Sequence, residues 1–164
     1  MNERWKPIAS GAGLVLVALC LYCLWLWQPE RQVLKHNEHF LKAAENRNRA
    51  KFAGFIDASY ADRWNHDKGF IVREASEVLR QFFALTIRSE SVECTMSDDH
   101  AAVTARIRIE GRGTAIAELA RSETNALTEP WLFEWKRKSW KPWDWKLVRV
   151  DQTQLRLDRS FNLD

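Results

Sequence analysis

The stretch that decides the fold runs from Glu129 to Gln152 and reads EPWLFEWKRKSWKPWDWKLVRVDQ. It holds five of the nine tryptophans of the chain. From Trp131 to Trp135 an aromatic residue occupies every second position, the period that places side chains on alternate faces of a strand. The same spacing returns from Trp143 to Leu147, after a polar segment that contains Pro142. The pattern predicts an antiparallel hairpin whose aromatic side chains form one wall of the core.

The length and composition of the chain bound its class. A chain of 164 residues fits one domain with an appendage, and 46% hydrophobic with 29% charged residues excludes disordered and fibrous proteins. A net charge of +3 is too small to indicate nucleic-acid binding, so we expect no nucleic-acid partner. Cys94 stands alone in the polar part of the sequence, while Cys20 and Cys23 lie in an apolar run and are interpreted as lipid-compatible residues.

The apolar run from Ile8 to Trp27 contains no charged residue and is long enough to cross a bilayer as a helix. Tryptophans flank it at both ends, as in interfacial belts. We therefore predict a short tail over residues 1–7 and an uncleaved single-pass membrane anchor over residues 8–27. The alternative is a cleaved signal peptide behind Arg4 and Lys6, which requires a shorter apolar core and small residues at the cleavage site. The short tail favours a cytoplasmic N-terminus and an extracytoplasmic domain, although basic residues flank both ends of the run.

Three amphipathic segments follow the predicted anchor. The first begins at Pro29 and ends near Asn46, and the second is a short segment around Phe52. Asp67 is positioned to cap the third, whose apolar stripe extends from Phe70 to Phe83. These spacings predict three helices.

Strand-like alternation begins near Leu85 and changes phase around residues 89–91, which indicates a bulge. A turn at residues 97–100 leads into a half-buried strand from Val103 to Ile109. Gly111 and Gly113 are then expected to turn the chain into a further strand from Thr114 to about Thr124. The prediction is an α+β domain over residues 28–157, with about three helices packed on a curved antiparallel sheet of four to five strands in a cone-like arrangement, and a tail over residues 158–164.

Two segments carry a resemblance to a known group. The sequence YADRW at residues 60–64 and WDWKLVRV at residues 143–150 resemble the nuclear-transport-factor-2-like superfamily, over about residues 31–157. That superfamily includes ketosteroid isomerase, SnoaL-like cyclases, uncharacterised bacterial proteins and membrane-anchored subunits of type IV secretion. The resemblance implies a cone-shaped sheet whose mouth can hold a ligand. It also implies a homodimer through the outer face of the sheet, which Val148 and Val150 would allow; the alternative is that a helix or the tail covers these two residues. It carries no catalytic residue over to this chain, because fold and function are separable.

The candidate site residues lie near the expected mouth of the cone. Asp62, beside Tyr60 and Trp64, could act as a base whose pKa is raised by burial, with Tyr60 as a hydrogen-bond donor. Trp135 of the hairpin completes the predicted ligand-binding set. The alternative is structural: Asp62 binds backbone or pairs with Arg63, while the aromatic residues pack between helix and sheet.

A second candidate surface is the turn of the hairpin, where cations alternate with tryptophans. Its members are Lys136, Arg137, Lys138 and Lys141 with Trp135, Trp140 and Trp143. Such a surface suits lipid headgroups or a nucleic-acid strand, and the alternative is a solvated turn whose cations stack on exposed rings. His66 is expected to be a solvated loop residue, and Asp98, Asp99 and His100 are expected to form a turn without metal. No cofactor motif is present.

These features lead to one function with two alternatives. We expect a membrane-anchored, non-catalytic binding module for a partner protein or a small apolar ligand. The alternatives are an isomerase- or cyclase-type enzyme with an acid–base residue in the cone, and a structural subunit of a cell-envelope complex. A homodimer or an envelope protein is the expected partner besides the membrane.

Overall fold

The structure is a computed structural model that describes residue 17 and residues 28–155. The predicted tails and nearly all of the predicted anchor from Ile8 to Trp27 lie outside these residues. Within the described part of the chain, no helix combines the length and the apolar character needed to cross a membrane.

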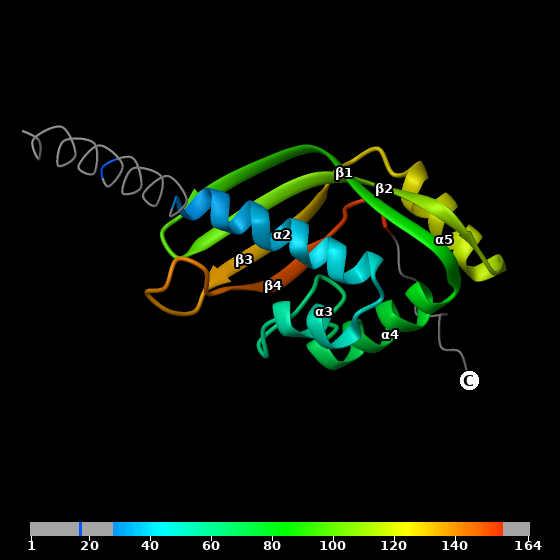
Figure 1. Cartoon of the computed structure of the whole chain (residues 1–164), viewed down its shortest axis with the longest axis horizontal. Helices are drawn as coiled ribbons and strands as arrows, with labels where there is room; N and C mark the ends of the chain where they lie inside the picture. The colour runs from blue at the N-terminus through cyan, green and yellow to red at the C-terminus, as the bar shows by residue number, and fades with distance from the viewer. Residues whose placement is uncertain (1–16, 18–27, 156–164) are drawn as a thin grey trace, which may run out of the picture.

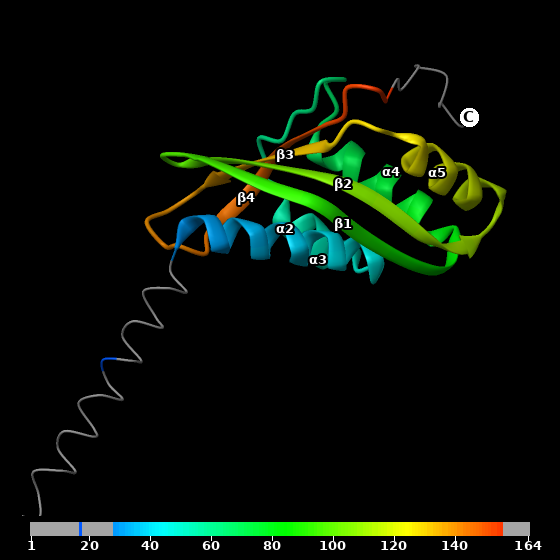
Figure 2. The ribbon, with the colours of Figure 1, turned by 90° about the horizontal axis from the view of Figure 1, so that it is seen from above.

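Four helices and four strands make up the described domain, so the α+β class is confirmed (Figure 1). They are α2 (Pro29–Glu45), α3 (Arg49–Phe55), α4 (Lys68–Arg80), β1 (Phe82–Ser97), β2 (His100–Gly113), α5 (Ala115–Ala126), β3 (Trp131–Arg137) and β4 (Trp145–Asp151). The strands form one antiparallel sheet in the order β1-β2-β3-β4. Figure 2 shows α2 running along one face of this sheet.

The three predicted helices form for local reasons. Pro29 occupies the first turn of α2, where its missing N–H costs nothing. Asn48 caps α3 by accepting from the backbone N–H of Lys51, and Asp67 caps α4 by accepting from that of Phe70 at 2.7 Å. The capping role predicted for Asp67 is confirmed.

The predicted strand from Thr114 to about Thr124 is wrong, because these residues form most of α5. Residues 115–126 contain four alanines and two glutamates, which are strong helix formers. Gly113 allows α5 to pack closely on the sheet, since a Cβ at this position would lie 2.4 Å from the Cβ of Ala117. The two glycines do not form a hairpin turn; they belong to the end of β2, where Gly113 pairs with Phe82 and Gly111 with Leu85.

The bulge predicted at residues 89–91 is confirmed. The β1–β2 register shifts between Glu90 and Glu93, and Ser91 adopts a positive φ of 50°. The turn at residues 97–100 is also confirmed, with Ser97 paired to His100.

The hairpin of β3 and β4 forms as predicted, but its second strand begins at Trp145 rather than at Trp143. Trp143 lies in the connecting loop and is 53% exposed, so its prediction as a core residue is wrong. A register shift after Glu134 leaves Val148 without a partner on β3 and pairs Val150 with Phe133, on the core side. The outer-face position predicted for Val150 is therefore wrong.

Candidate functional site

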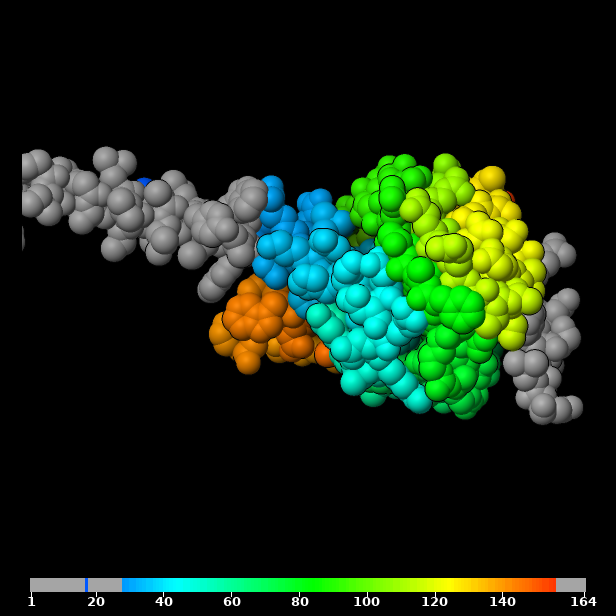
Figure 3. Space-filling view, turned by 45° about the vertical axis from the view of Figure 1, so that its right-hand side comes forward, coloured from blue at the N-terminus to red at the C-terminus, as the bar shows by residue number. Residues whose placement is uncertain are grey.

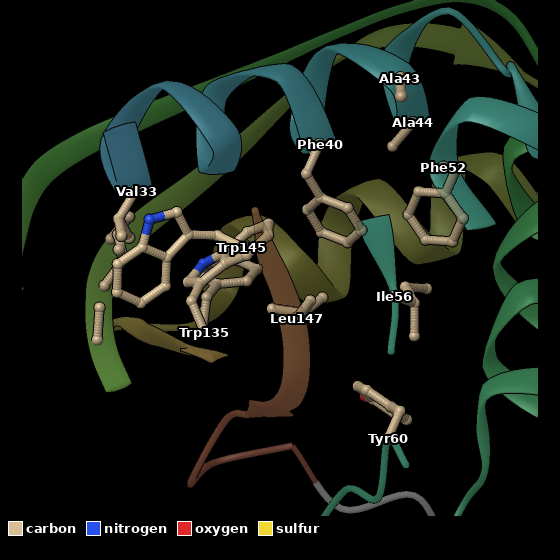
Figure 4. Packing of buried hydrophobic residues seen from close by; sticks show 14 of the residues in the cluster. Val33, Phe40, Ala43, Ala44, Phe52, Ile56, Tyr60, Trp135, Trp145 and Leu147 are labelled. Atoms are coloured by element: carbon tan, nitrogen blue, oxygen red, sulfur yellow. The ribbon is translucent and has the colours of Figure 1, made fainter. Parts of the chain in front are cut away.

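The concave side of the sheet is filled by side chains. Trp135, Trp145 and Leu147 are at most 1% exposed, and Figure 4 shows them beneath α2. Phe40 of α2 contacts this wall edge-on, with its ring centroid 6.1 Å from that of Trp135, and stacks on Phe52 at 4.8 Å. The interior is thus an aromatic core rather than an open chamber.

Two hollows open at the surface instead. One of about 230 Å³ lies between the end of α2, the start of α3 and the end of α4. Another of about 290 Å³ is lined by residues of α2, α3 and the segment 143–146. The predicted ligand-binding residues Tyr60, Asp62, Trp64 and Trp135 line neither of them.

The segment that carries Tyr60 and Asp62 runs along the free edge of β4. Ile56 forms a parallel bridge with Leu147, and the backbone N–H of Asp57 donates to the oxygen of Leu147 at 2.9 Å. The N–H of Ala61 then donates to the oxygen of Val148 at 3.2 Å. The segment therefore covers an edge that would otherwise expose unpaired backbone groups.

Asp62 holds this segment in a turn. Its Oδ1 accepts from the backbone N–H of Trp64 at 2.9 Å and of His66 at 2.8 Å, and its Oδ2 lies 2.9 Å from His66 Nδ1. The Asp62 side chain is 1% exposed. Arg63 pairs with Asp151 and not with Asp62. A carboxylate whose two oxygens both bind the local turn is arranged for structure, which favours the backbone-binding alternative.

His66 also differs from the sequence expectation of a solvated loop residue. Its ring stacks on Phe70 with centroids 4.1 Å apart and lies 6.3 Å from the ring of Trp64. His66 therefore links the Asp62 turn to the first turn of α4.

Tyr60 is the most unusual member of the predicted set. It is 3% exposed, and its hydroxyl faces the backbone of Val150 without a hydrogen bond of normal geometry among the described residues. Burial raises the pKa of Tyr60, and the negative charge of Asp62 raises this pKa further, so the phenol stays protonated at neutral pH. Figure 4 shows Tyr60 well apart from Trp135, on the far side of Leu147. The structure thus groups Tyr60, Asp62 and Trp64 in one segment and places Trp135 elsewhere in the core.

A buried carboxylate that the sequence did not single out is Asp57. Burial opposes its charge, but hydrogen bonds from Ser59 and the ammonium of Lys138 at 3.0 Å outweigh burial and lower the pKa of Asp57 to about 2. The Asp-x-Ser spacing is typical of a local side-chain turn, so the Ser59 contact could be found from sequence. The Lys138 contact could not, because it joins two segments that are distant in the chain.

The basic and aromatic hairpin turn is divided by the structure. Trp135 is buried, whereas Trp140 is 83% exposed and Trp143 53% exposed.

In the neighbouring turn, Asp99 lies 2.6 Å from His100 Nδ1. Across the described residues, no cluster of three or more histidine, cysteine, aspartate or glutamate side chains is arranged to hold a metal ion.

Sequence comparisons find no relative: no protein-family profile matches the chain, and no curated protein matches it. Solved structures do match. A conserved protein from Planctomyces limnophilus has a TM-score of 0.57 at 12% identity, covering 75% of this chain and 93% of that one. A candidate ketosteroid isomerase from Shewanella frigidimarina has a TM-score of 0.54 at 14% identity, covering 75% and 93%.

Two further matches extend the range of proteins with this architecture. Bd1075 of Bdellovibrio bacteriovorus has a TM-score of 0.56 at 13% identity, and the match covers 74% of this chain but only 40% of Bd1075. An NTF2-like protein from Cytophaga hutchinsonii has a TM-score of 0.52 at 14% identity, covering 72% and 91%. At these identities the likeness concerns the fold alone. The described domain therefore has the fold of the nuclear-transport-factor-2-like proteins.

Proposed function

We propose that this chain is a membrane-tethered, non-catalytic interaction module that binds a partner protein. The observation that supports this most is the filled interior. In an enzyme of the isomerase or cyclase type, the cone must admit a substrate beside an acid or base. Here Trp135 and Trp145 occupy that space, and Asp62 is bonded to its own turn. A filled cone favours binding on the outside of the domain, and so favours a protein over a small apolar ligand.

The tether in this proposal rests on the apolar run from Ile8 to Trp27. The folded domain begins at Pro29, directly after that run, so the domain would sit close to the bilayer surface.

The partner surface that we propose lies at the end of the domain where α4, β1 and α5 meet. Exposed apolar side chains there are Val78 at 36%, Phe83 at 74%, Ile116 at 48% and Leu119 at 53%. Figure 1 places this end of the domain opposite the start of α2. Exposed apolar groups that gather at one end favour protein contact, and their position would direct them away from the membrane.

Photo-crosslinking in membranes tests the proposal. A benzoylphenylalanine placed at Phe83 is expected to yield a discrete crosslinked protein, whereas the same group at exposed Glu38 of α2 is not. Crosslinks to a second copy of the chain would identify a homodimer, and crosslinks to several fixed neighbours would identify a subunit of an envelope complex. Full-length protein recovered without detergent in the soluble fraction would contradict the tether. A crosslink at neither position would contradict the partner surface.

The enzyme alternative is favoured by one observation, the buried Tyr60 hydroxyl without a partner. Such a group could donate to a substrate oxygen if the core opened. Isothermal calorimetry with an apolar ketone such as a steroid enone tests this. Heat of binding that disappears in Tyr60→Phe would support the alternative. No heat at millimolar ligand concentration would contradict it and favour the interaction module.

A further inference from the structure

The loop that joins β3 to β4, residues 138–144, exposes two large aromatic side chains. Trp140 is 83% exposed and Trp143 53% exposed. Tryptophan contributes more to stability when it is buried, and two exposed indoles in one short loop indicate a surface that an apolar environment covers in the cell. Figure 3 shows this loop, in orange, standing out from the body of the domain beside the start of α2.

The exposure of the two indoles is built into a hydrogen-bonded loop. The backbone N–H of Lys138 donates to the oxygen of Asp144 at 2.8 Å, which closes the loop at its base. The indole N–H of buried Trp145 donates to the oxygen of Pro142 at 2.9 Å, and the Lys138 ammonium pairs with Asp57 at 3.0 Å. The loop is therefore fixed to the core at several points and presents Trp140 and Trp143 in a defined shape.

The loop lies at the end of the domain where the predicted anchor joins. Figures 1 and 2 both show it beside the start of α2, and Trp143 lines one hollow together with His36 of that helix. His36 is seven residues after Pro29, which corresponds to about 10 Å along an α-helix. An anchor that ends at Trp27 would therefore bring the loop to the membrane interface.

The charge around the two indoles is positive. Between residues 136 and 146 one acidic residue, Asp144, stands against five basic ones, namely Lys136, Arg137, Lys138, Lys141 and Lys146. The neighbouring β1–β2 turn adds Asp98 and Asp99, of which Asp99 is engaged by His100 and by Lys136 at 4.0 Å. Among the described residues, the Lys141 ammonium has no ion-pair partner.

We propose that residues 138–144 form a second membrane contact, with Trp140 and Trp143 seated in the interface of an anionic phospholipid bilayer and Lys141 directed at the headgroup phosphates. Indole rings favour the interfacial region, and a lysine close to an anionic surface adds attraction. The contact deepens the proposed function and rests on its tether. With two points of attachment instead of one, the domain has a fixed orientation on the bilayer.

Tryptophan quenching by brominated lipid tests the contact. The full-length protein is reconstituted into vesicles of dibrominated phosphatidylglycerol or phosphatidylcholine, as wild type and as the double variant Trp140→Phe/Trp143→Phe. Brominated lipid is expected to quench the two loop tryptophans and also Trp5, Trp25 and Trp27 of the predicted anchor region. Because the double variant lacks two of these five, it is expected to lose about two-fifths of the quenched intensity in phosphatidylglycerol. The loss is expected to be smaller in phosphatidylcholine. Glu123→Ala, at an exposed position of α5 at the opposite end of the domain, serves as the control and is expected to leave quenching unchanged.

The outcomes separate the loop contact from the tether. Equal quenching of the wild type and the double variant would overturn the loop contact while leaving the tether intact. No quenching in either protein would overturn the tether and the loop contact together. A single-stranded oligonucleotide added to the protein in lipid-free detergent tests the nucleic-acid alternative. If it quenches the wild type but not the double variant, and at least as strongly as the brominated lipid does, the loop binds nucleic acid and the lipid assignment is wrong.

Discussion

Two buried tryptophans of the hairpin give a matched test of the core. Trp135 is 0% and Trp145 1% exposed, but only Trp145 has a partner for its indole N–H, the oxygen of Pro142 at 2.9 Å. The indole N–H of Trp135 is buried without a partner among the described residues. Replacing each by phenylalanine therefore removes a similar apolar volume. Only Trp145→Phe breaks a hydrogen bond, whereas Trp135→Phe removes an unpaired donor.

The expected magnitudes differ clearly. In both variants the smaller ring loses about 1 kcal/mol of apolar burial and leaves a cavity that costs about 1 kcal/mol more. Trp135→Phe also removes an unpaired buried donor, which restores about 1–3 kcal/mol, so its net effect on the free energy of unfolding is near zero. Trp145→Phe loses a made hydrogen bond worth about 1 kcal/mol, so its total cost is about 3 kcal/mol.

Urea unfolding of the full-length protein in mild detergent, followed by far-ultraviolet circular dichroism, measures both values. The dependence of the unfolding free energy on urea should be the same in both variants if only stability changes. Trp140→Phe, at an 83% exposed position, is the control and should lie within about 0.5 kcal/mol of wild type. A Trp135→Phe variant as unstable as Trp145→Phe would refute the assignment of Trp135 as a tolerated, unsatisfied donor.

Three further predictions concern single positions. Lys138 and local hydrogen bonds lower the pKa of Asp57 from 3.8 to about 2, so ionised Asp57 stabilises the fold above pH 4. This contribution, about 1 kcal/mol after solvent screening, is lost as the pH falls towards 2. Urea titrations between pH 6 and 2 should show a shallower acid slope for Asp57→Asn, and an unchanged slope would contradict the ion pair. Asn37 is 2% exposed with an unpaired Oδ1, so Asn37→Leu should raise the free energy of unfolding by about 1 kcal/mol, and a clear loss would point to a hidden partner. Gly113→Ala should lower the free energy of unfolding by about 2 kcal/mol or more, because the new Cβ would lie 2.4 Å from the backbone oxygen of Gln81. In Gly54→Ala the new Cβ meets nothing within 4 Å, so this variant should stabilise α3 by about 0.5–1 kcal/mol. Equal melting temperatures of the two variants would contradict both expectations.

Much of the fold followed from local patterns. The caps of α3 and α4, the bulge around Ser91 and the β3–β4 hairpin each depend on residues within a few positions of one another, so a single sequence could indicate most of them. The error over residues 114–124 had a different cause. The glycines before that segment matched a hairpin turn, and this outweighed the helix-forming composition of residues 115–126. Gly113 is small because α5 packs on the sheet there, which is a tertiary reason that sequence spacing does not contain.

The candidate site was harder to predict because its chemistry depends on what each polar atom contacts. Sequence placed Asp62 beside aromatic residues, which is compatible with a base and with a loop cap alike. The distinction rests on its two oxygens, which accept from the backbone of Trp64 and His66. The Lys138 partner of Asp57 lay beyond any local pattern for the same reason. Two groups of the predicted site keep an unpaired donor among the described residues, the Tyr60 hydroxyl and the Trp135 indole N–H.

The tryptophans of the hairpin show how one alternating pattern can contain two different surfaces. Trp143 continues the spacing of Trp145, yet it lies in the loop before the strand. The loop is closed by the hydrogen bond from the Lys138 N–H to the oxygen of Asp144, and the Trp145 indole donates to the oxygen of Pro142, so the strand begins only at Trp145. Side chains on the core side of the strand are covered by α2, while Trp140 is 83% exposed and Trp143, which lines a hollow beside His36, is 53% exposed. A domain that needed tryptophan only for packing would gain nothing from two exposed indoles held in a fixed loop. Their position beside the start of α2 is better explained by an apolar medium outside the protein, which is why the membrane interface is the occupant that we infer for this loop.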